Sequence, residues 1–183
     1  ACLVGSEMCI RDSNSSHPNN QKQRHLTWKT LLTLQKSGLI KSVGVSNFLI
    51  RHLEDLKKCE GSSVPAVNQV EWHPHHFDLE LLKYCREEGI FLQAYSSLGS
   101  SNAISLRHDP TVIRIAEKLR KSPAQVLLRW AFQQNIGILP KGSSQAHIVE
   151  NIDLDFVLPE DDMNELASLK VKEKYAWDPT VVS

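Results

Sequence analysis

The chain has 183 residues, enough for one sizeable core, and its 21 lysines and arginines balance 21 aspartates and glutamates. Zero net charge argues against a nucleic-acid or anionic-lipid partner, and no stretch is apolar over the roughly eighteen residues of a membrane span or long enough for a secretory signal. The four cysteines form no C-x-x-C pair, as is typical of reduced thiols, so we expect a cytoplasmic globular protein.

Residues 1–25 differ in composition from the rest of the chain. Their stretch RDSNSSHPNNQKQRH has hardly any apolar side chain that could offset the entropy cost of ordering the backbone. We therefore expect a disordered leader over residues 1–25 and one folded domain over residues 26–183.

From Leu26 onward, helix and strand patterns alternate. HLTWKTLLTLQKSG has apolar residues at helical spacing and ends at Gly38, a typical C-cap. IKSVGVSNF predicts a strand, IRHLEDLKKC an amphipathic helix and PAVNQVEW a second strand. DLELLKYCREEG predicts a helix with Asp78 as N-cap and Gly89 at its end, and IFLQAYSS predicts a third strand.

The remaining segments continue the alternation. DPTVIRIAEKLRK and SPAQVLLRWAFQQN predict helices, the second with Ser122 as N-cap, Pro123 at the first helical position and Gln125 completing a capping box. IGILP predicts a fourth strand, and short helices follow near residues 144–152 and 160–169.

This order predicts an α/β fold with a parallel sheet, either doubly wound or part of a (β/α)8 barrel. Each predicted strand ends in a polar or aromatic residue, and in a barrel these ends gather at the face that holds the active site. A Rossmann sheet would have G-x-G-x-x-G after its first strand, and this motif is absent, so we favour the barrel. The strand ends are Ser46-Asn47, Gln69, Tyr95-Ser96 and Lys141.

The stretch ILPKGSSQAHIVEN has the features of an anion-binding site. After the predicted strand come a lysine, a glycine that permits close backbone approach and two serine hydroxyls, and the following helix adds free N–H groups and the positive end of its dipole. A histidine one turn later could reach the same anion. The alternative is a solvated, N-capped helix whose lysine faces water.

Five stretches in order carry a resemblance to a known family: GLIKSVGVSNF, VNQVEWHPHH, QAYSSLGS, ILPKGSSQAHIVEN and KYAWDPT. From about Leu26 to its end, the chain resembles the aldo-keto reductases, NADPH-dependent barrel enzymes that reduce aldehydes and ketones. In character it is closest to small members such as the glyoxal or prostaglandin F synthase-like reductases. The resemblance implies NADPH as cofactor and a small aldehyde or ketone as substrate.

The resemblance also implies a cofactor site. Ser46, Asn47 and Gln69 would bind the nicotinamide carboxamide. Tyr95 would stack on the nicotinamide ring, unless it only fills the barrel mouth. The diphosphate would contact Ser96, Leu98, Gly99 and Ser100, the 2′-phosphate would contact Lys141, Gly142, Ser143 and His147, and the adenine would contact Glu150 and Asn151.

Two positions depart from the family pattern. Members commonly have serine where this chain has Gly142, and arginine where it has His147. A histidine holds a phosphate less firmly than a fixed guanidinium, so we expect a weaker NADPH preference than is usual, sharpening as the pH falls and the imidazole gains its proton.

Carbonyl reduction in the family uses a tyrosine proton donor tuned by a lysine and an aspartate, and a histidine that orients the carbonyl. That tyrosine follows the aspartate by five positions, and none of Tyr84, Tyr95 and Tyr175 has an aspartate there. We therefore expect a partial barrel of strands five to eight that lacks its N-terminal half and its catalytic tetrad. Such a chain would be inactive alone and could self-associate through exposed sheet edges.

Three alternatives stay open. GVSNF is similar to the G-x-S-x-G elbow, which would make Ser46 a hydrolase nucleophile, although Phe48 replaces the last glycine. HPHH at 73–76 with Glu71 suggests a metal site, but its spacing matches no common ligand motif, so we expect none. The third alternative is a half-barrel that binds a cofactor or a partner and does not catalyse a reaction.

The tail KEKYAWDPTVVS resembles the family's C-terminal loop over the substrate pocket. Trp177 is then a candidate aromatic on the substrate side. Its alternative role is an anchor that pins the tail to the barrel wall.

Overall fold

The computed structural model describes residues 7–11, 20–59, 61–99 and 104–176. The chain divides into two compact units. Unit 1 comprises residues 1–70, 79–92 and 178–183, and unit 2 comprises residues 71–78 and 93–177. The predicted alternation of strands and helices is present in both units.

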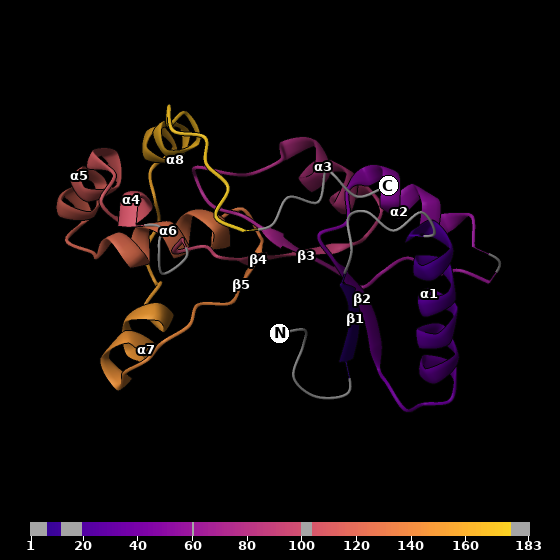
Figure 1. The fold of residues 1–183 in the computed structure, drawn as a ribbon. Coiled ribbons are helices and arrows are strands. Elements are labelled where there is room, and N and C mark those ends of the chain that lie inside the picture. Colours follow the sequence, from indigo (N-terminus) through magenta and orange to yellow (C-terminus); the bar gives the residue numbers. More distant parts are fainter. Residues whose placement is uncertain (1–6, 12–19, 60, 100–103, 177–183) are drawn as a thin grey trace. The chain divides into compact units, whose positions relative to one another are not determined.

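Unit 1 is built on parallel strands. Strand β1 (Glu7–Arg11) pairs with β2 (Ser42–Ser46), and β2 pairs with β3 (Val67–Glu71). The helices are α1 (Asn20–Lys36), which lies alongside β2 (Figure 1), α2 (Ile50–Lys57) and α3 (Leu79–Glu87). Each helix buries apolar side chains, as the helical spacing predicted; they include Trp28, Leu31, Leu53, Leu56 and Leu82.

The start of α1 corrects the prediction for the leader. The helix begins at Asn20 rather than Leu26, and β1 also lies within the segment that was predicted to be disordered. Arg24 is buried, and the Asp55 carboxylate of α2 accepts hydrogen bonds or ion pairs from Gln21, Arg24 at 3.5 Å and His25 at 3.0 Å. Polar composition was misleading here because a buried carboxylate, distant in sequence, satisfies these side chains.

Unit 2 contains the end of β4 (Phe91–Tyr95), which pairs in parallel with the two-residue strand β5 (Gly137–Ile138). Its helices are α4 (Ile104–Arg107), α5 (Pro110–Leu119), α6 (Pro123–Phe132), α7 (Gln145–Ile152) and α8 (Glu160–Ala167). Helix α5 packs on α6 and α8, and α7 lies next to α6. Trp72 and Trp130 stack in the core with ring centroids 6.2 Å apart.

Local signals set the helix ends as predicted. Ser122 Oγ accepts from the Gln125 N–H at 3.1 Å, and Gln125 Oε1 accepts from the Ser122 N–H at 3.0 Å, which completes the capping box. Gly38 follows α1 with φ 78°, a left-handed conformation that glycine adopts without strain. Strand β5 is shorter than predicted, and Pro140, which has no N–H to donate to a ladder, follows it closely.

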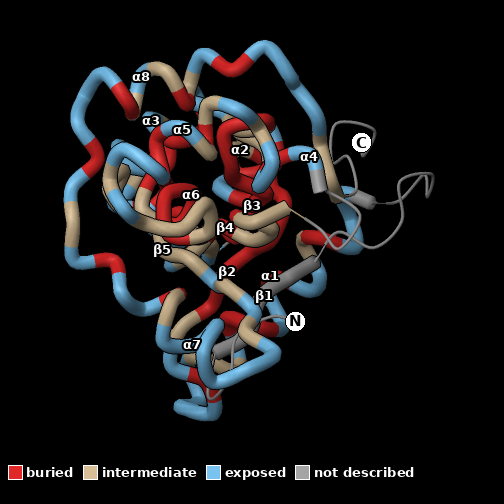
Figure 2. The backbone as a smooth tube through the Cα atoms, turned by 90° about the vertical axis from the view of Figure 1, so that its left-hand side faces the viewer, coloured by how far each residue is buried: buried red, intermediate tan, exposed pale blue. Residues whose placement is uncertain are grey.

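Burial distinguishes the elements clearly (Figure 2). Strands β2 and β3 and helix α6 are largely buried, whereas α7 is exposed except for Asn151 and the half-buried Glu150. Within the described residues, no helix combines the length and apolar character that crossing a bilayer requires.

Candidate functional site

The carboxyl ends of β2 and β3 bring three of the predicted residues together in unit 1. Ser46 and Gln69 are paired in the strand register. The Gln69 carbonyl accepts from Ser46 Oγ at 3.1 Å and from the Asn47 N–H at 2.9 Å. All three residues are buried, and Asn47 has φ 60°, a left-handed conformation that asparagine tolerates better than most residues. The strand ends are therefore held in one fixed geometry.

Asn68 supports this turn and was not identified from the sequence. Its Nδ2 donates to the Phe48 carbonyl at 2.8 Å, and its Oδ1 accepts from the Phe48 N–H at 3.3 Å. The side chain is fully buried, so the two bonds compensate its desolvation. The signal that could have identified it is an amide side chain inside a strand that is otherwise expected to be buried on both faces of a parallel sheet.

The Ser46 geometry disfavours the hydrolase alternative. Its hydroxyl donates to a backbone carbonyl instead of a histidine, and α2 begins only at Ile50. A nucleophile elbow needs an exposed serine at a turn that leads directly into a helix. The observed serine is buried at the end of a strand.

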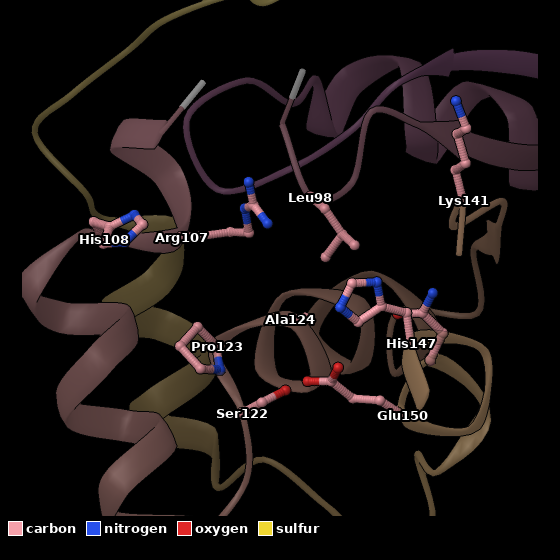
Figure 3. A pocket seen from close by; sticks show the side chains of 10 residues that line it. Leu98, Arg107, His108, Ser122, Pro123, Ala124, Lys141, His147 and Glu150 are labelled. Atoms are coloured by element: carbon pink, nitrogen blue, oxygen red, sulfur yellow. The ribbon is translucent and has the colours of Figure 1, made fainter. Parts of the chain in front are cut away.

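Unit 2 contains a hollow formed by two adjoining cavities with volumes of about 300 Å³ and 500 Å³. The linings of the two cavities share Leu98, Arg107, Lys141 and His147, so the cavities adjoin each other. In Figure 3, Arg107 enters from the α4 side, and Lys141 and His147 lie across the hollow from it.

Most residues predicted for the phosphate and adenine groups border this hollow. The larger cavity is lined by Ser96, Leu98, Gly99, Lys141, Ser143 and His147, and the smaller one adds Glu150 and Asn151. Tyr95 ends β4 directly before the loop, which turns through left-handed conformations at Ser96 (φ 54°) and Gly99 (φ 78°). Ser100 and Trp177 lie outside the described residues.

The start of α7 forms one wall of the hollow. Ser144 is its N-cap and accepts from the His147 N–H at 3.2 Å, while Ser143 Oγ lies 3.4 Å from His147 Nδ1. The predicted close approach at Gly142 is made to α7 itself, because a Cβ there would lie 2.7 Å from Ile148 Cγ1. Ser144 Oγ takes the N–H of His147, whereas the N–H groups of Gln145 and Ala146, which precede it in the first turn, have no carbonyl partner within the helix, so this end favours an anion.

The charges around the hollow are not compensated internally. Neither Lys141 nor Arg107 forms an ion pair with a described residue, and Glu150 is the single carboxylate among the lining side chains of the two cavities. Elsewhere in unit 2, Lys118 pairs with Asp162 at 2.9 Å and Lys121 with Asp153 at 3.0 Å. The hollow therefore has an excess of positive charge that suits an anionic ligand.

Comparison with known proteins identifies the family. Residues 13–171 match the sequence profile of the Aldo/keto reductase family. The chain belongs to the aldo/keto reductase family. It is 40% identical over 154 residues to the glyoxal reductase of Bacillus subtilis (strain 168), covering 84% of this chain and 54% of that protein. It is 38% identical over 157 residues to aldo-keto reductase family 1 member A1 of Gallus gallus, covering 81% and 48%.

Solved structures agree with this assignment. MGS-M4, an aldo-keto reductase from a Medee basin deep-sea metagenome library, superposes with a TM-score of 0.85 at 31% identity, covering 97% of this chain and 64% of that one. Gox0644 in its apo form gives a TM-score of 0.78 at 36% identity, covering 87% and 58%. The fold is thus of the TIM-barrel type with a parallel sheet, as the family resemblance implied. The chain spans about half the length of the relatives it matches.

The HPHH segment of this aldo/keto reductase chain is used in an internal network. The buried Glu71 carboxylate accepts from His73 Nε2 at 3.0 Å, Lys174 Nζ at 2.8 Å and the N–H groups of Tyr175 at 2.6 Å and Ala176 at 3.1 Å. We call Glu71, His73, Lys174 and Tyr175 the Glu71 cluster. It attaches residues 173–176 to the loop after β3. In the described residues, no three histidine, cysteine or acidic side chains form a group that could hold a metal ion.

Hydrogen bonds to Glu71 together have a larger effect on the pKa of its carboxyl group than burial has. Burial alone would raise the pKa of Glu71, but the bonds from His73, Lys174 and the Tyr175 N–H outweigh it and lower the pKa to about 2. Next to it, His75 Nδ1 lies 2.6 Å from the Tyr175 hydroxyl, and its Nε2 lies 3.5 Å from Asp109 Oδ2. Burial lowers the pKa of His75 and raises that of Tyr175, so both are neutral at pH 7.

Proposed function

We propose that this chain carries the NADPH-binding part of an aldo-keto reductase that reduces an aldehyde or ketone by hydride transfer. The observation that supports it is the hollow of unit 2, where a lysine with no ion-pair partner among the described residues and the start of α7 line the same cavity as the loop after β4. When bound, the dinucleotide supplies the hydride. The volume, the polar lining and the excess positive charge all fit its phosphate-bearing half.

The 2′-phosphate would be held by Lys141, Ser143 and the first-turn N–H groups of α7. A lysine supplies a point charge, and a serine hydroxyl donates one hydrogen bond. His147 adds a second charge when the pH is low enough for its imidazole to be protonated. This group is present in NADPH and absent from NADH, so these residues would set the preference between the two.

The nicotinamide carboxamide would bind to Ser46, Asn47 and Gln69. The Ser46 hydroxyl already donates its single proton to the Gln69 carbonyl, which leaves its lone pairs free to accept from the carboxamide NH₂. Because the hydroxyl is buried and fixed, this acceptor is preorganised. Tyr95, at the end of β4, would stack on the nicotinamide ring.

We propose further that this chain does not itself protonate the alkoxide that forms as the carbonyl is reduced. The Tyr84 hydroxyl donates to Glu54, and the Tyr175 hydroxyl contacts His75 and Ser105. Burial is the main cause that raises the pKa of each phenol, so neither is tuned to release a proton near neutral pH. The remaining tyrosine, Tyr95, is assigned to the cofactor.

The test is fluorescence titration of the purified chain with NADPH and with NADH. Lys141→Gln should weaken NADPH binding about 10- to 100-fold, because it removes a charge-assisted contact of about 1.5–3 kcal/mol, and should change NADH binding by less than about threefold. Lys170→Gln, which alters an exposed lysine that lines none of these cavities, is the matched control.

Two results would count against the proposal. Absence of saturable NADPH binding to the unsubstituted chain would remove the cofactor assignment. Reduction of methylglyoxal by the chain and NADPH would contradict the statement that it lacks a proton donor, while leaving the cofactor assignment intact.

A further inference from the structure

A third cavity of unit 2, which we call the apolar groove, lies where α6, β5 and the end of α7 meet. Its volume is about 470 Å³. Most of its lining side chains are apolar: Phe132, Ile138, Pro140, Ile152 and Leu154. Phe132 ends α6 and is 50% exposed, and Ile152 ends α7 and is 75% exposed. Large apolar side chains gathered around a groove and open to solvent are typical of an interaction surface.

The end of α7 places an apolar ridge directly beside the groove. The ridge consists of Ile148, Val149 and Ile152, which are three or four residues apart and therefore neighbours on one face of the helix. Ile148 is 53% exposed and Val149 is 56% exposed. Figure 2 shows that α7 is exposed over most of its length. The same surface thus has both a projection and a depression, and both are apolar.

The groove also has one charged side chain of each sign, Arg129 and Asp155. Asp155 is exposed and forms no ion pair with a described residue. Arg129 donates to the Leu154 carbonyl at 3.1 Å, which holds the guanidinium in place, but it has no carboxylate partner in the described part of the chain. By contrast, Asp153 pairs with Lys121 at 3.0 Å. The groove therefore offers a fixed positive charge and a negative charge, neither of which is matched by an opposite charge.

These features make the surface self-complementary. In a dimer with two-fold symmetry, both chains use the same patch, and each contact occurs twice. The ridge of one copy then fills the groove of the other, and Arg129 of one copy faces Asp155 of the other. An anionic lipid surface or a nucleic acid would require an excess of positive charge, which this groove lacks. A second copy of the chain fits both the shape and the charges.

We infer that the apolar groove and the α7 ridge form the interface of a homodimer of this chain. Apolar contacts supply most of the affinity, and the two Arg129–Asp155 pairs set the orientation of the copies. The contact is made by side chains, so it differs from backbone pairing at the edges of the sheet. It does not depend on the proposed function.

Sedimentation equilibrium of the purified chain tests the interface. Between about 1 and 100 μM the chain should change from monomer to dimer and form nothing larger, because a two-fold contact closes on itself. Ile152→Glu should weaken the dimer about 100-fold or more, since it places a carboxylate in the apolar groove of each partner. Leu79→Glu is the matched control: this α3 leucine is 58% exposed and lies outside the groove, so the dimer should change by less than about twofold.

Asp155→Lys tests the charge pairs. It places a lysine opposite Arg129 of the other copy at two points, so it should weaken the dimer about 10-fold, and less at high salt. Asp155→Asn should have a smaller effect. Asp161→Lys changes the net charge by the same amount at an exposed acid of α8 outside the groove, so it should leave the dimer nearly unchanged.

Several outcomes would overturn the inference. One is a chain that sediments as a monomer over the whole range, and another is a species that keeps growing with concentration. A dimer that withstands both Ile152→Glu and Asp155→Lys would place self-association on another surface, such as the sheet edges. Equal weakening by the control variants would assign the effect to surface charge in general. Melting temperatures of all variants should match that of the parent because every substituted side chain is exposed.

Discussion

Unit 2 holds two polar clusters that use charge in opposite ways. In the Glu71 cluster, a buried carboxylate is matched by a lysine, a histidine and backbone N–H groups. Around the hollow, Arg107 and Lys141 are exposed and have no ion-pair partner in the described part of the chain. In the Glu71 cluster every charge has an opposite charge or a hydrogen-bond partner, whereas the positive charges at the hollow, on Arg107 and Lys141, have no carboxylate partner among the described residues.

This difference distinguishes a cluster that stabilises the fold from a hollow whose charge suits an anionic ligand. A carboxylate that is already saturated has little capacity left for a metal ion, and removing any partner leaves a buried charge. Cations without internal partners cost little to leave in water and gain from binding an anion. The histidine-rich segment, which resembles a ligand set in the sequence, therefore serves the fold, and the inconspicuous Arg107 faces the hollow.

The largest expected effect on stability comes from removing the carboxylate of the Glu71 cluster. Glu71→Ala should lower the free energy of unfolding by about 3–5 kcal/mol, because it leaves His73 and Lys174 without their shared carboxylate in a buried place. Urea denaturation followed by circular dichroism measures the loss. Glu117→Ala, an exposed acid on α5, should stay within about 0.5 kcal/mol of the parent. A loss below about 1 kcal/mol for Glu71→Ala would mean that the cluster is not structural.

The free energy of unfolding should depend on pH through the ionisation of the same Glu71 carboxyl group. The pKa of Glu71 falls from its ordinary 4.5 to about 2 in the folded protein, so folding favours the ionised form. Its contribution, on the order of 3 kcal/mol, is fully present above pH 4.5 and is lost as the pH falls towards 2. The difference in unfolding free energy between the parent and Glu71→Gln should shrink over this window. A difference that stays constant down to pH 3 would contradict the prediction.

Sequence patterns predicted those features of the molecule that are determined by residues close together in the sequence. Apolar spacing gave the helices and strands, and Ser122 with Gln125 gave a helix start, because these signals lie within a few residues of their effect. The grouping of Lys141, Ser143 and His147 at one hollow was predictable because they lie in one continuous stretch. They were assigned to the phosphate by family resemblance, and the structure places them around one hollow.

The missed features depend on partners that are distant in the sequence. The early start of α1 depends on Asp55, which satisfies polar side chains that by composition favoured disorder. Arg107 was missed because α4 has only four residues and no periodic pattern, and because a free arginine differs from a paired one only in its three-dimensional neighbours. Glu71 and Lys174 are likewise joined only by the fold.

The smallest expected effect on stability concerns Gly142, which lies next to the hollow and is commonly serine in the family. Gly142→Ser should cost about 1 kcal/mol of stability, because the new Cβ would lie 2.7 Å from Ile148 Cγ1 and 3.2 Å from the Ile148 N. Ile148 is 53% exposed, so its side chain can move aside and limit the cost. In an Ile148→Ala background, where Cγ1 is gone, the same change should cost less than half as much. Urea denaturation of the four proteins gives this coupling, and equal costs in both backgrounds would show that the backbone of α7, rather than the isoleucine side chain, sets the requirement for glycine.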